Sequence, residues 1–143
     1  GAQEWYDAQV DLFASWGVDF LKVDDMQTPF HADEIAAYRL AMLKAEEKYE
    51  RPLSLSLSPG AWLSTRHADF LRNHTEMWRI SDDLWDNWDD VLAQFSRLAR
   101  WAGFSGNGHW ADADMLPLGI SEYVRSVVRT GWCGLSDDEQ LSM

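Results

Sequence analysis

A lysine and two adjacent aspartates lie near the start of the chain, in the stretch Trp16-Gly-Val-Asp-Phe-Leu-Lys-Val-Asp-Asp-Met26. Its apolar residues predict a buried β-strand, whose side chains alternate between two faces, so Lys22 and Asp24 share a face. At the end of such a strand, this pair is either a structural ion pair or a carboxylate that an ammonium group keeps ionised for catalysis. The stretch alone does not decide between them.

Two more predicted strands carry carboxylates at their ends. The strand expected at 77–83 places Arg79 and Asp83 on one face, and the strand expected at 110–115 carries Asp114 near its end. Carboxylates at several strand ends are what barrel glycosidases require. The repetition favours catalysis over a single ion pair.

The elements that must position these side chains alternate along the chain. Strands are predicted at 16–26, 53–58, 77–83 and 110–115, and helices at 4–15, 31–50, 66–73, 88–101, 120–129 and from Ser136. In the strand 53–58, leucines should face covering helices and serines a tight interior. This order predicts an α/β fold with parallel strands. A (β/α)8 barrel is favoured over a doubly wound sheet because no glycine-rich phosphate loop follows the first strand.

The helices should pack on this sheet through apolar faces. The spacing in 4–15 predicts a helix with Trp5, Ala8, Leu12 and Ser15 near one face and Val10 and Phe13 beside them. The helix at 31–50 should bury Ile35, Tyr38, Met42, Ala45 and Tyr49. Helix 88–101 should bury Val91, Leu92, Phe95, Leu98 and Ala99.

Composition excludes several classes of protein. The chain has 24 acidic and 12 basic residues and a net charge of -12, which disfavours nucleic acid and anionic membranes as partners. Its single cysteine, Cys133, allows no internal disulfide, and the four histidines lack metal-ligand spacing. We expect neither a signal peptide nor a membrane span. The nine tryptophans fit a sugar-binding cleft or an ordinary core.

Three motifs resemble a known family in their order and separation. They are G-V-D-F-L-K-V-D-D, W-R-I-S-D-D-L-W-D-N-W and G-H-W-A-D-A-D-M-L-P-L-G, and they resemble the α-galactosidase and α-N-acetylgalactosaminidase family, glycoside hydrolase family 27. The resemblance implies that residues 1–143 are one partial (β/α)8 TIM-barrel catalytic domain, roughly family strands 4 to 7. The first strands, the eighth strand and the C-terminal β-sandwich would be missing.

The resemblance also implies an activity in carbohydrate metabolism. Family members are retaining hydrolases of terminal α-galactosides or related glycosides such as β-L-arabinopyranosides, and they need no metal or other cofactor. They are often secreted, periplasmic or lysosomal, and the compartment of this chain stays open. The implied nucleophile is Asp24 and the implied general acid/base is Asp83. The implied substrate-binding residues are Lys22, Arg79, Asp114 and Met115, with Trp110 either stacking on sugar or packing in a core.

The chain departs from the family pattern in ways that leave its substrate open. Ser58-Pro59-Gly60 stands where many members have a cysteine-glutamate-tryptophan sequence that senses the sugar's 2-position, and Met26 stands where many have a cysteine. Ile120–Gly134 resembles an insertion, in which Trp132 lies in an exposed loop or lines an aglycone site. An open partial barrel would expose its sheet edges, so we also expect self-association. The alternative to an enzyme is an inactive fragment that self-assembles through those edges.

Overall fold

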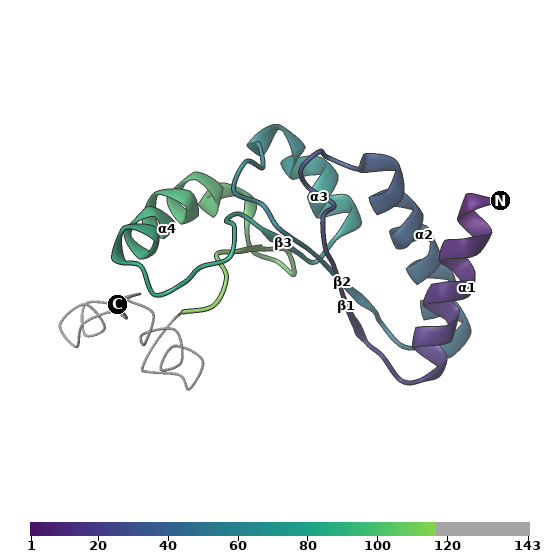
Figure 1. The fold of residues 1–143 in the computed structure, drawn as a ribbon. Coiled ribbons are helices and arrows are strands. Elements are labelled where there is room, and N and C mark those ends of the chain that lie inside the picture. The colour runs from purple at the N-terminus through teal and green to yellow at the C-terminus, as the bar shows by residue number, and fades with distance from the viewer. Residues whose placement is uncertain (117–143) are drawn as a thin grey trace.

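The computed structural model describes residues 1–116, and the expectations for 120–129, Ile120–Gly134 and the helix from Ser136 lie outside them. Strands and helices alternate along this part of the chain (Figure 1). The elements are α1 (Ala2–Ser15), β1 (Phe20–Val23), α2 (Ala32–Tyr49), β2 (Ser54–Leu57), η1 (Thr65–His67), α3 (Ala68–His74), β3 (Met77–Arg79), α4 (Trp88–Trp101), η2 (Ala102–Phe104) and β4 (Trp110–Asp112). The predicted alternation is confirmed, with strands shorter than expected.

The strands form one parallel sheet in chain order, β1-β2-β3-β4. A doubly wound sheet reverses its strand order, whereas a barrel does not, so the order agrees with part of a (β/α)8 barrel. The register aligns one residue from each strand across the sheet, namely Lys22, Ser56, Met77 and Trp110.

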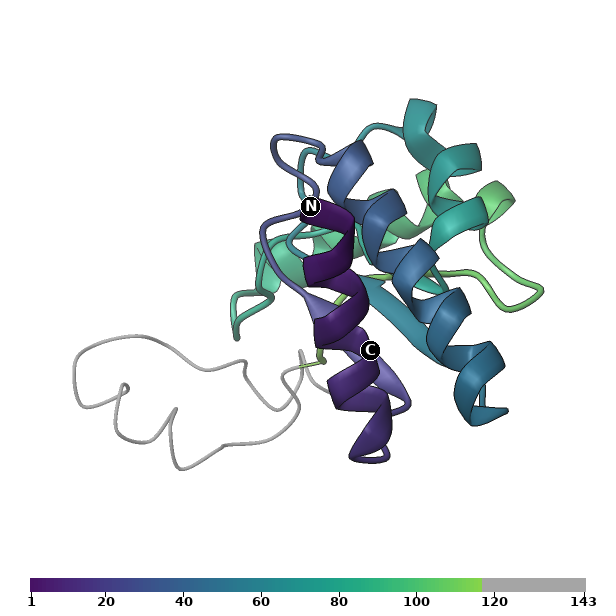
Figure 2. The ribbon, with the colours of Figure 1, turned by 90° about the vertical axis from the view of Figure 1, so that its right-hand side faces the viewer.

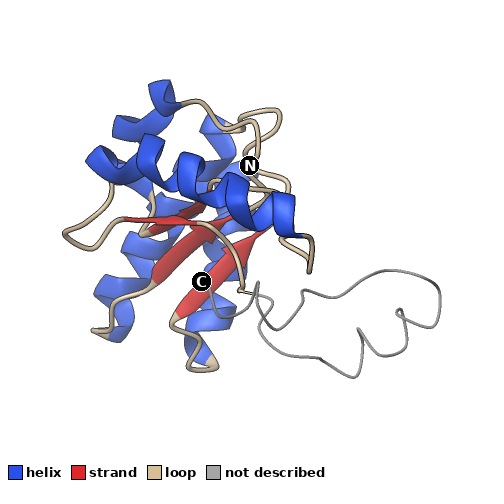
Figure 3. Cartoon of the chain, turned by 90° about the vertical axis from the view of Figure 1, so that its left-hand side faces the viewer, coloured by secondary structure: helices blue, strands red, loops and turns tan. Residues whose placement is uncertain are grey.

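The two faces of the sheet have different surroundings. Leu55, Leu57 and Trp78 are fully buried on the face that the helices cover (Figures 1 and 3). On the opposite face, Phe20 is 50% exposed and Trp110 is 54% exposed. We call this second side the open face. It corresponds to the inner side of a barrel, where the serines of β2 were expected.

The prediction that β1 is a buried strand is wrong for this part of the chain. Phe20 and Lys22 are exposed, and only Leu21 and Val23 are partly buried. The reason is that β1 lies at an edge of the sheet and no described element covers its open face.

Two of the predicted helix faces are only partly right. In α1 the buried residues are Val10, which was expected beside the packed face, and Ala14, while Trp5, Ala8 and Leu12 are exposed. In α4, Val91 and Trp101 are buried, but the expected core residues Leu92, Phe95 and Leu98 are exposed. Both helices carry more apolar surface than the described sheet covers. The prediction for α2 holds better, since Ile35, Met42 and Ala45 are buried.

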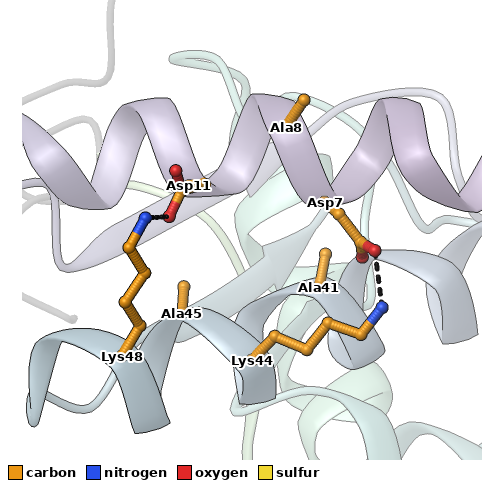
Figure 4. Close-up of a pocket in the computed structure, with 7 residues that line it drawn as sticks. All are labelled: Asp7, Ala8, Asp11, Ala41, Lys44, Ala45 and Lys48. Carbon is orange, nitrogen blue, oxygen red and sulfur yellow. Dashed lines mark hydrogen bonds and ion pairs between the residues drawn. The ribbon is translucent and has the colours of Figure 1, made fainter.

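Helices α1 and α2 lie side by side (Figure 2) and are joined by two ion pairs (Figure 4). Lys44 donates to Asp7, and Lys48 Nζ donates to Asp11 Oδ1 at 2.6 Å. The hydrogen bond from Lys44, and to a smaller extent that from Gln3, lowers the pKa of Asp7. The hydrogen bond from Lys48 lowers the pKa of Asp11. Between these pairs lie the small side chains of Ala8, Ala41 and Ala45.

Candidate active site

The predicted carboxylates follow three different strands at the same edge of the sheet. Asp24 comes directly after β1, Asp83 follows β3 by four residues, and Asp114 follows β4 by two. Because the strands are parallel, their carboxyl ends share one rim, as in barrel enzymes. The strands of Asp24 and Asp83 are separated only by β2, so their axes are about 10 Å apart at roughly 4.8 Å per spacing.

Asp24 is exposed and has a hydrogen-bond partner that the sequence did not suggest. Ser58, at the end of β2, donates from Oγ to Asp24 Oδ1 at 2.9 Å. The next residue, Asp25, has a left-handed backbone with φ of 57°, which aspartate tolerates better than most residues. Within the described residues, Lys22 is exposed and forms no ion pair with Asp24, so the structural ion pair considered above is absent. Ser58 orients this carboxylate instead.

The buried guanidinium of Arg79 holds two other carboxylates. Arg79 Nη2 lies 2.8 Å from Asp83 Oδ1, and Arg79 Nη1 lies 2.8 Å from Asp114 Oδ1. The Arg79 side chain is 2% exposed, whereas that of Asp83 is 67% exposed. Removing one partner from a buried ion pair leaves an uncompensated charge, so these contacts hold the rim together. Asp83 nevertheless keeps much of its carboxylate open to solvent.

Asp114 is largely occupied by bonds within the protein. Its Oδ1 contacts Arg79, and its Oδ2 accepts from the backbone N–H of Leu84 at 2.7 Å. Its own backbone N–H donates to Asp112 Oδ1 at 2.8 Å. Asp114 therefore ties the loop after β3 to the end of β4.

Three other predicted substrate-binding residues are accessible. Lys22, Trp110 and Met115 are all exposed, and the strand register places Lys22 and Trp110 on the open face. Trp110 therefore does not pack in the core of the described residues. The sequence interpretation missed Ser58 as a partner of Asp24, although the leucine-serine alternation of β2 does place its serines on this face.

The described part of the chain offers no group of three or more histidine, cysteine, aspartate or glutamate residues that could hold a metal ion. Within the same residues, no helix is long and apolar enough to cross a membrane.

A parallel β/α sheet with carboxylates at its carboxyl rim is the arrangement that barrel glycosidases use. Residues 1–131 match the family model described as alpha galactosidase A. The chain belongs to this glycoside hydrolase family, and its fold is part of the family's (β/α)8 barrel.

The relatives include glycosidases that are named for different substrates. The chain is 29% identical over 119 residues to an α-galactosidase of Oryza sativa subsp. japonica, covering 83% of this chain and 28% of the relative. It is 35% identical over 121 residues to an α-N-acetylgalactosaminidase of Gallus gallus, covering 79% of this chain and 29% of the relative.

A solved structure is more similar still. The chain is 44% identical to a family 27 β-L-arabinopyranosidase of Geobacillus stearothermophilus, with a TM-score of 0.73, covering 83% of this chain and 27% of that one. The chain thus spans less than a third of the length of these relatives.

Proposed function

We propose that this chain carries the catalytic pair of a retaining glycosidase that cleaves terminal α-galactosides or closely related glycosides. In this proposal Asp24 is the nucleophile and Asp83 is the general acid/base, and residues 1–143 belong to a single partial-barrel catalytic domain. The observation that supports the proposal is that the two aspartates follow the carboxyl ends of β1 and β3, with only β2 between these strands, in a chain of this family.

The space between the two aspartates suits a double displacement. That reaction needs carboxyl groups about 5 to 5.5 Å apart, closer than the strand axes themselves. Both side chains must therefore lean over the end of β2, where the chain has the small residues Ser58 and Gly60.

The proposed reaction has two steps. Asp24 attacks the anomeric carbon, and the bond to the leaving oxygen breaks while Asp83 gives that oxygen a proton. Asp83 then takes a proton from water, whose oxygen displaces Asp24 and releases the sugar with retained configuration. The hydrogen bond from Ser58 keeps one oxygen of Asp24 oriented during the attack.

The remaining residues are proposed to hold the sugar. Lys22, Trp110 and Met115 are exposed on or beside the open face, where they can contact hydroxyl groups or a ring face. Arg79 was expected to contact the sugar near its 2-position, but its side chain is 2% exposed and both Nη atoms bind carboxylates, so in this proposal it acts by holding Asp83. Asp114 would act mainly by holding Arg79, because both of its oxygens already accept bonds.

Hydrolysis of 4-nitrophenyl α-galactoside tests the proposal. Asp24→Asn should abolish turnover, and Asp83→Asn should lower kcat by roughly 10²- to 10⁴-fold, the usual contribution of a general acid/base. The matched controls are Asp25→Asn and Asp82→Asn, which change the adjacent carboxylates and should keep most of the activity. Turnover that survives both Asp24→Asn and Asp83→Asn would contradict the assignment.

A second candidate follows from the exposed edges of the sheet. Among the described strands, β1 and β4 each have one unpaired edge, and Phe20 and Trp110 are exposed on the open face. Such edges pair with other chains unless they are covered. We propose that the 143-residue chain by itself self-associates through them, with or without turnover. Sedimentation should show a species larger than a monomer, and a stable, well-folded monomer would contradict this.

A further inference from the structure

Gln27 connects the ends of three strands. It lies three residues after Asp24, in the loop that follows β1, and is only 4% exposed. Its side-chain Nε2 donates to the carbonyl of Pro59 at 2.7 Å and to the carbonyl of Arg79 at 3.0 Å. Pro59 follows β2, and Arg79 ends β3. One amide group thus uses both of its N–H bonds to link the carboxyl ends of β2 and β3.

The backbone of Gly60 completes this link. Its N–H donates to the carbonyl of Ser81 at 3.0 Å. A Cβ atom at Gly60 would lie 1.7 Å from the carbonyl oxygen of Arg79 and 2.8 Å from Nε2 of Gln27. Only glycine allows the loop after β2 to approach the end of β3 so closely. We call Gln27, Pro59, Gly60, Arg79 and Ser81 the rim junction.

The rim junction lies between the two proposed catalytic carboxylates. On one side, Ser58 precedes Pro59 and donates to Asp24. On the other side, the guanidinium of Arg79 holds Asp83. A shift of the Pro59 carbonyl relative to the Arg79 carbonyl would therefore move Asp24 and Asp83 relative to each other.

The chemistry of Gln27 indicates more than packing. Its Oε1 is buried and has no hydrogen-bond partner among the described residues. A buried, unpartnered carbonyl costs free energy, which an apolar side chain of the same size would avoid. Gln27 is thus favourable here only through its two donated bonds, and both of them go to the rim junction.

We propose that Gln27 is a positioning residue that fixes the separation between the carboxyl groups of Asp24 and Asp83. This inference rests on the proposed function for its catalytic meaning. Gly60 permits the approach, and Gln27 holds it. Displacement of a reacting group by about 1 Å can cost roughly 10²-fold in rate, so a change of this separation should be seen in kcat rather than in KM.

The first test replaces the amide by an apolar group of similar length. With 4-nitrophenyl α-galactoside, Gln27→Met should lower kcat by about 10- to 100-fold and leave KM within about threefold. The matched control is Gln3→Met, which makes the same chemical change where the amide donates to the Ala37 carbonyl at 3.1 Å, between the outer helices. The control should keep the wild-type kcat.

The second test does not depend on turnover. The Arg79 Nε–H donates to the carbonyl of Ser81, a residue of the rim junction, at 3.3 Å, so its exchange rate, measured by ¹⁵N NMR, reports whether the junction keeps its structure. We expect exchange at least about tenfold faster in Gln27→Met and unchanged in Gln3→Met. If the wild-type chain has no turnover but Gln27→Met exchanges faster than wild type, the result would support the rim junction and contradict the proposed function.

Two results would overturn the inference. They are an unchanged Arg79 exchange rate in folded Gln27→Met, and an unchanged kcat of that variant in an active chain. Should Gln27→Met fail to fold, Gln27→Asn replaces it in both measurements, because its amide is one methylene too short to reach both carbonyls.

Discussion

A single buried guanidinium holds the acidic side chains that follow β3 and β4. Arg79 reaches both Asp83 and Asp114 at 2.8 Å, which requires the fork of an arginine rather than the compact charge of a lysine. The strand alternation in the sequence selects Asp24 over Asp25 and Asp83 over Asp82. In the structure β1 ends at Val23 and β3 ends at Arg79, so all four aspartates follow the strands and the selection stays a prediction.

The same alternation could not predict Gln27 or Gly60. Gln27 bonds to residues 32 and 52 positions further along the chain, so its partners depend on how three strands align. The clearest local sign was Ser58-Pro59-Gly60, a departure from the family pattern whose structural meaning depends on the carbonyl of Arg79.

Replacement of Gly60 by alanine should destabilise the fold. The added Cβ would overlap the carbonyl of Arg79, and overpacking of this kind typically costs about 1 to 3 kcal/mol. Gly103→Ala is the matched control, because nothing lies within 4 Å of its added Cβ and its φ is not left-handed. Urea unfolding should show a lower midpoint for Gly60→Ala than for Gly103→Ala. Equal midpoints would mean that the approach of the two loops is looser than described.

At the scale of elements, α1 and α2 are held together by charge as well as by packing. Lys44 and Lys48 donate to Asp7 and Asp11 along one side of the contact (Figure 4). The sequence predicted the existence of both helices and the buried face of α2. It did not predict the buried face of α1, because periodicity identifies apolar residues without showing which of them the sheet covers.

The ion pairs between α1 and α2 should make stability depend on acidic pH. The pKa values of Asp7 and Asp11 lie below the ordinary 3.8 in the folded chain because Lys44 and Lys48 donate to them. A lowered carboxyl pKa contributes stability that is present above the unfolded value and lost as pH falls through the folded value. Acid should therefore remove the contribution of these pairs.

Comparison of wild type with the double variant Lys44→Met/Lys48→Met measures this contribution. In urea unfolding, wild type should be the more stable at about pH 6, and the difference should vanish near pH 2. Molar salt should shrink the difference at pH 6, because these side chains are exposed enough to be screened. If the difference in stability between wild type and the variant is the same at pH 2, it comes from packing of the lysine side chains and not from their charge.

At the scale of the whole molecule, apolar surface gathers at both ends of the sheet. Trp5, Leu12 and Phe20 are exposed on α1 and β1, and the same is true of Leu92 and Leu98 on α4. The strand order and the barrel-like fold could be predicted from the sequence, whereas this exposure could not. The apolar periodicity of a helix predicts that its apolar face is buried. Within the described residues, the sheet and the neighbouring helices cover only part of the apolar faces of α1 and α4.

Charges placed on the α4 surface should reduce the proposed self-association. The variant Leu92→Lys/Leu98→Lys should shift the sedimenting species toward the monomer without lowering the urea midpoint, since neither side chain is buried. The matched control is Leu40→Lys/Leu43→Lys, which changes two comparably exposed leucines on a different helix, α2. If the control variant shifts toward the monomer as much as the α4 variant does, the self-association does not depend on the α4 surface.

The strand order also has a kinetic consequence. Among the strands of residues 1–116, each one pairs with the strand next along the chain. The register pairs residues 21 to 34 positions apart, so each pairing closes one strand–helix unit, a shorter loop than pairing between the ends of the chain would need. During synthesis, each new β-strand can dock on the previous one as it leaves the ribosome, so the sheet can grow from β1 toward β4 while the rest of the chain is still being translated.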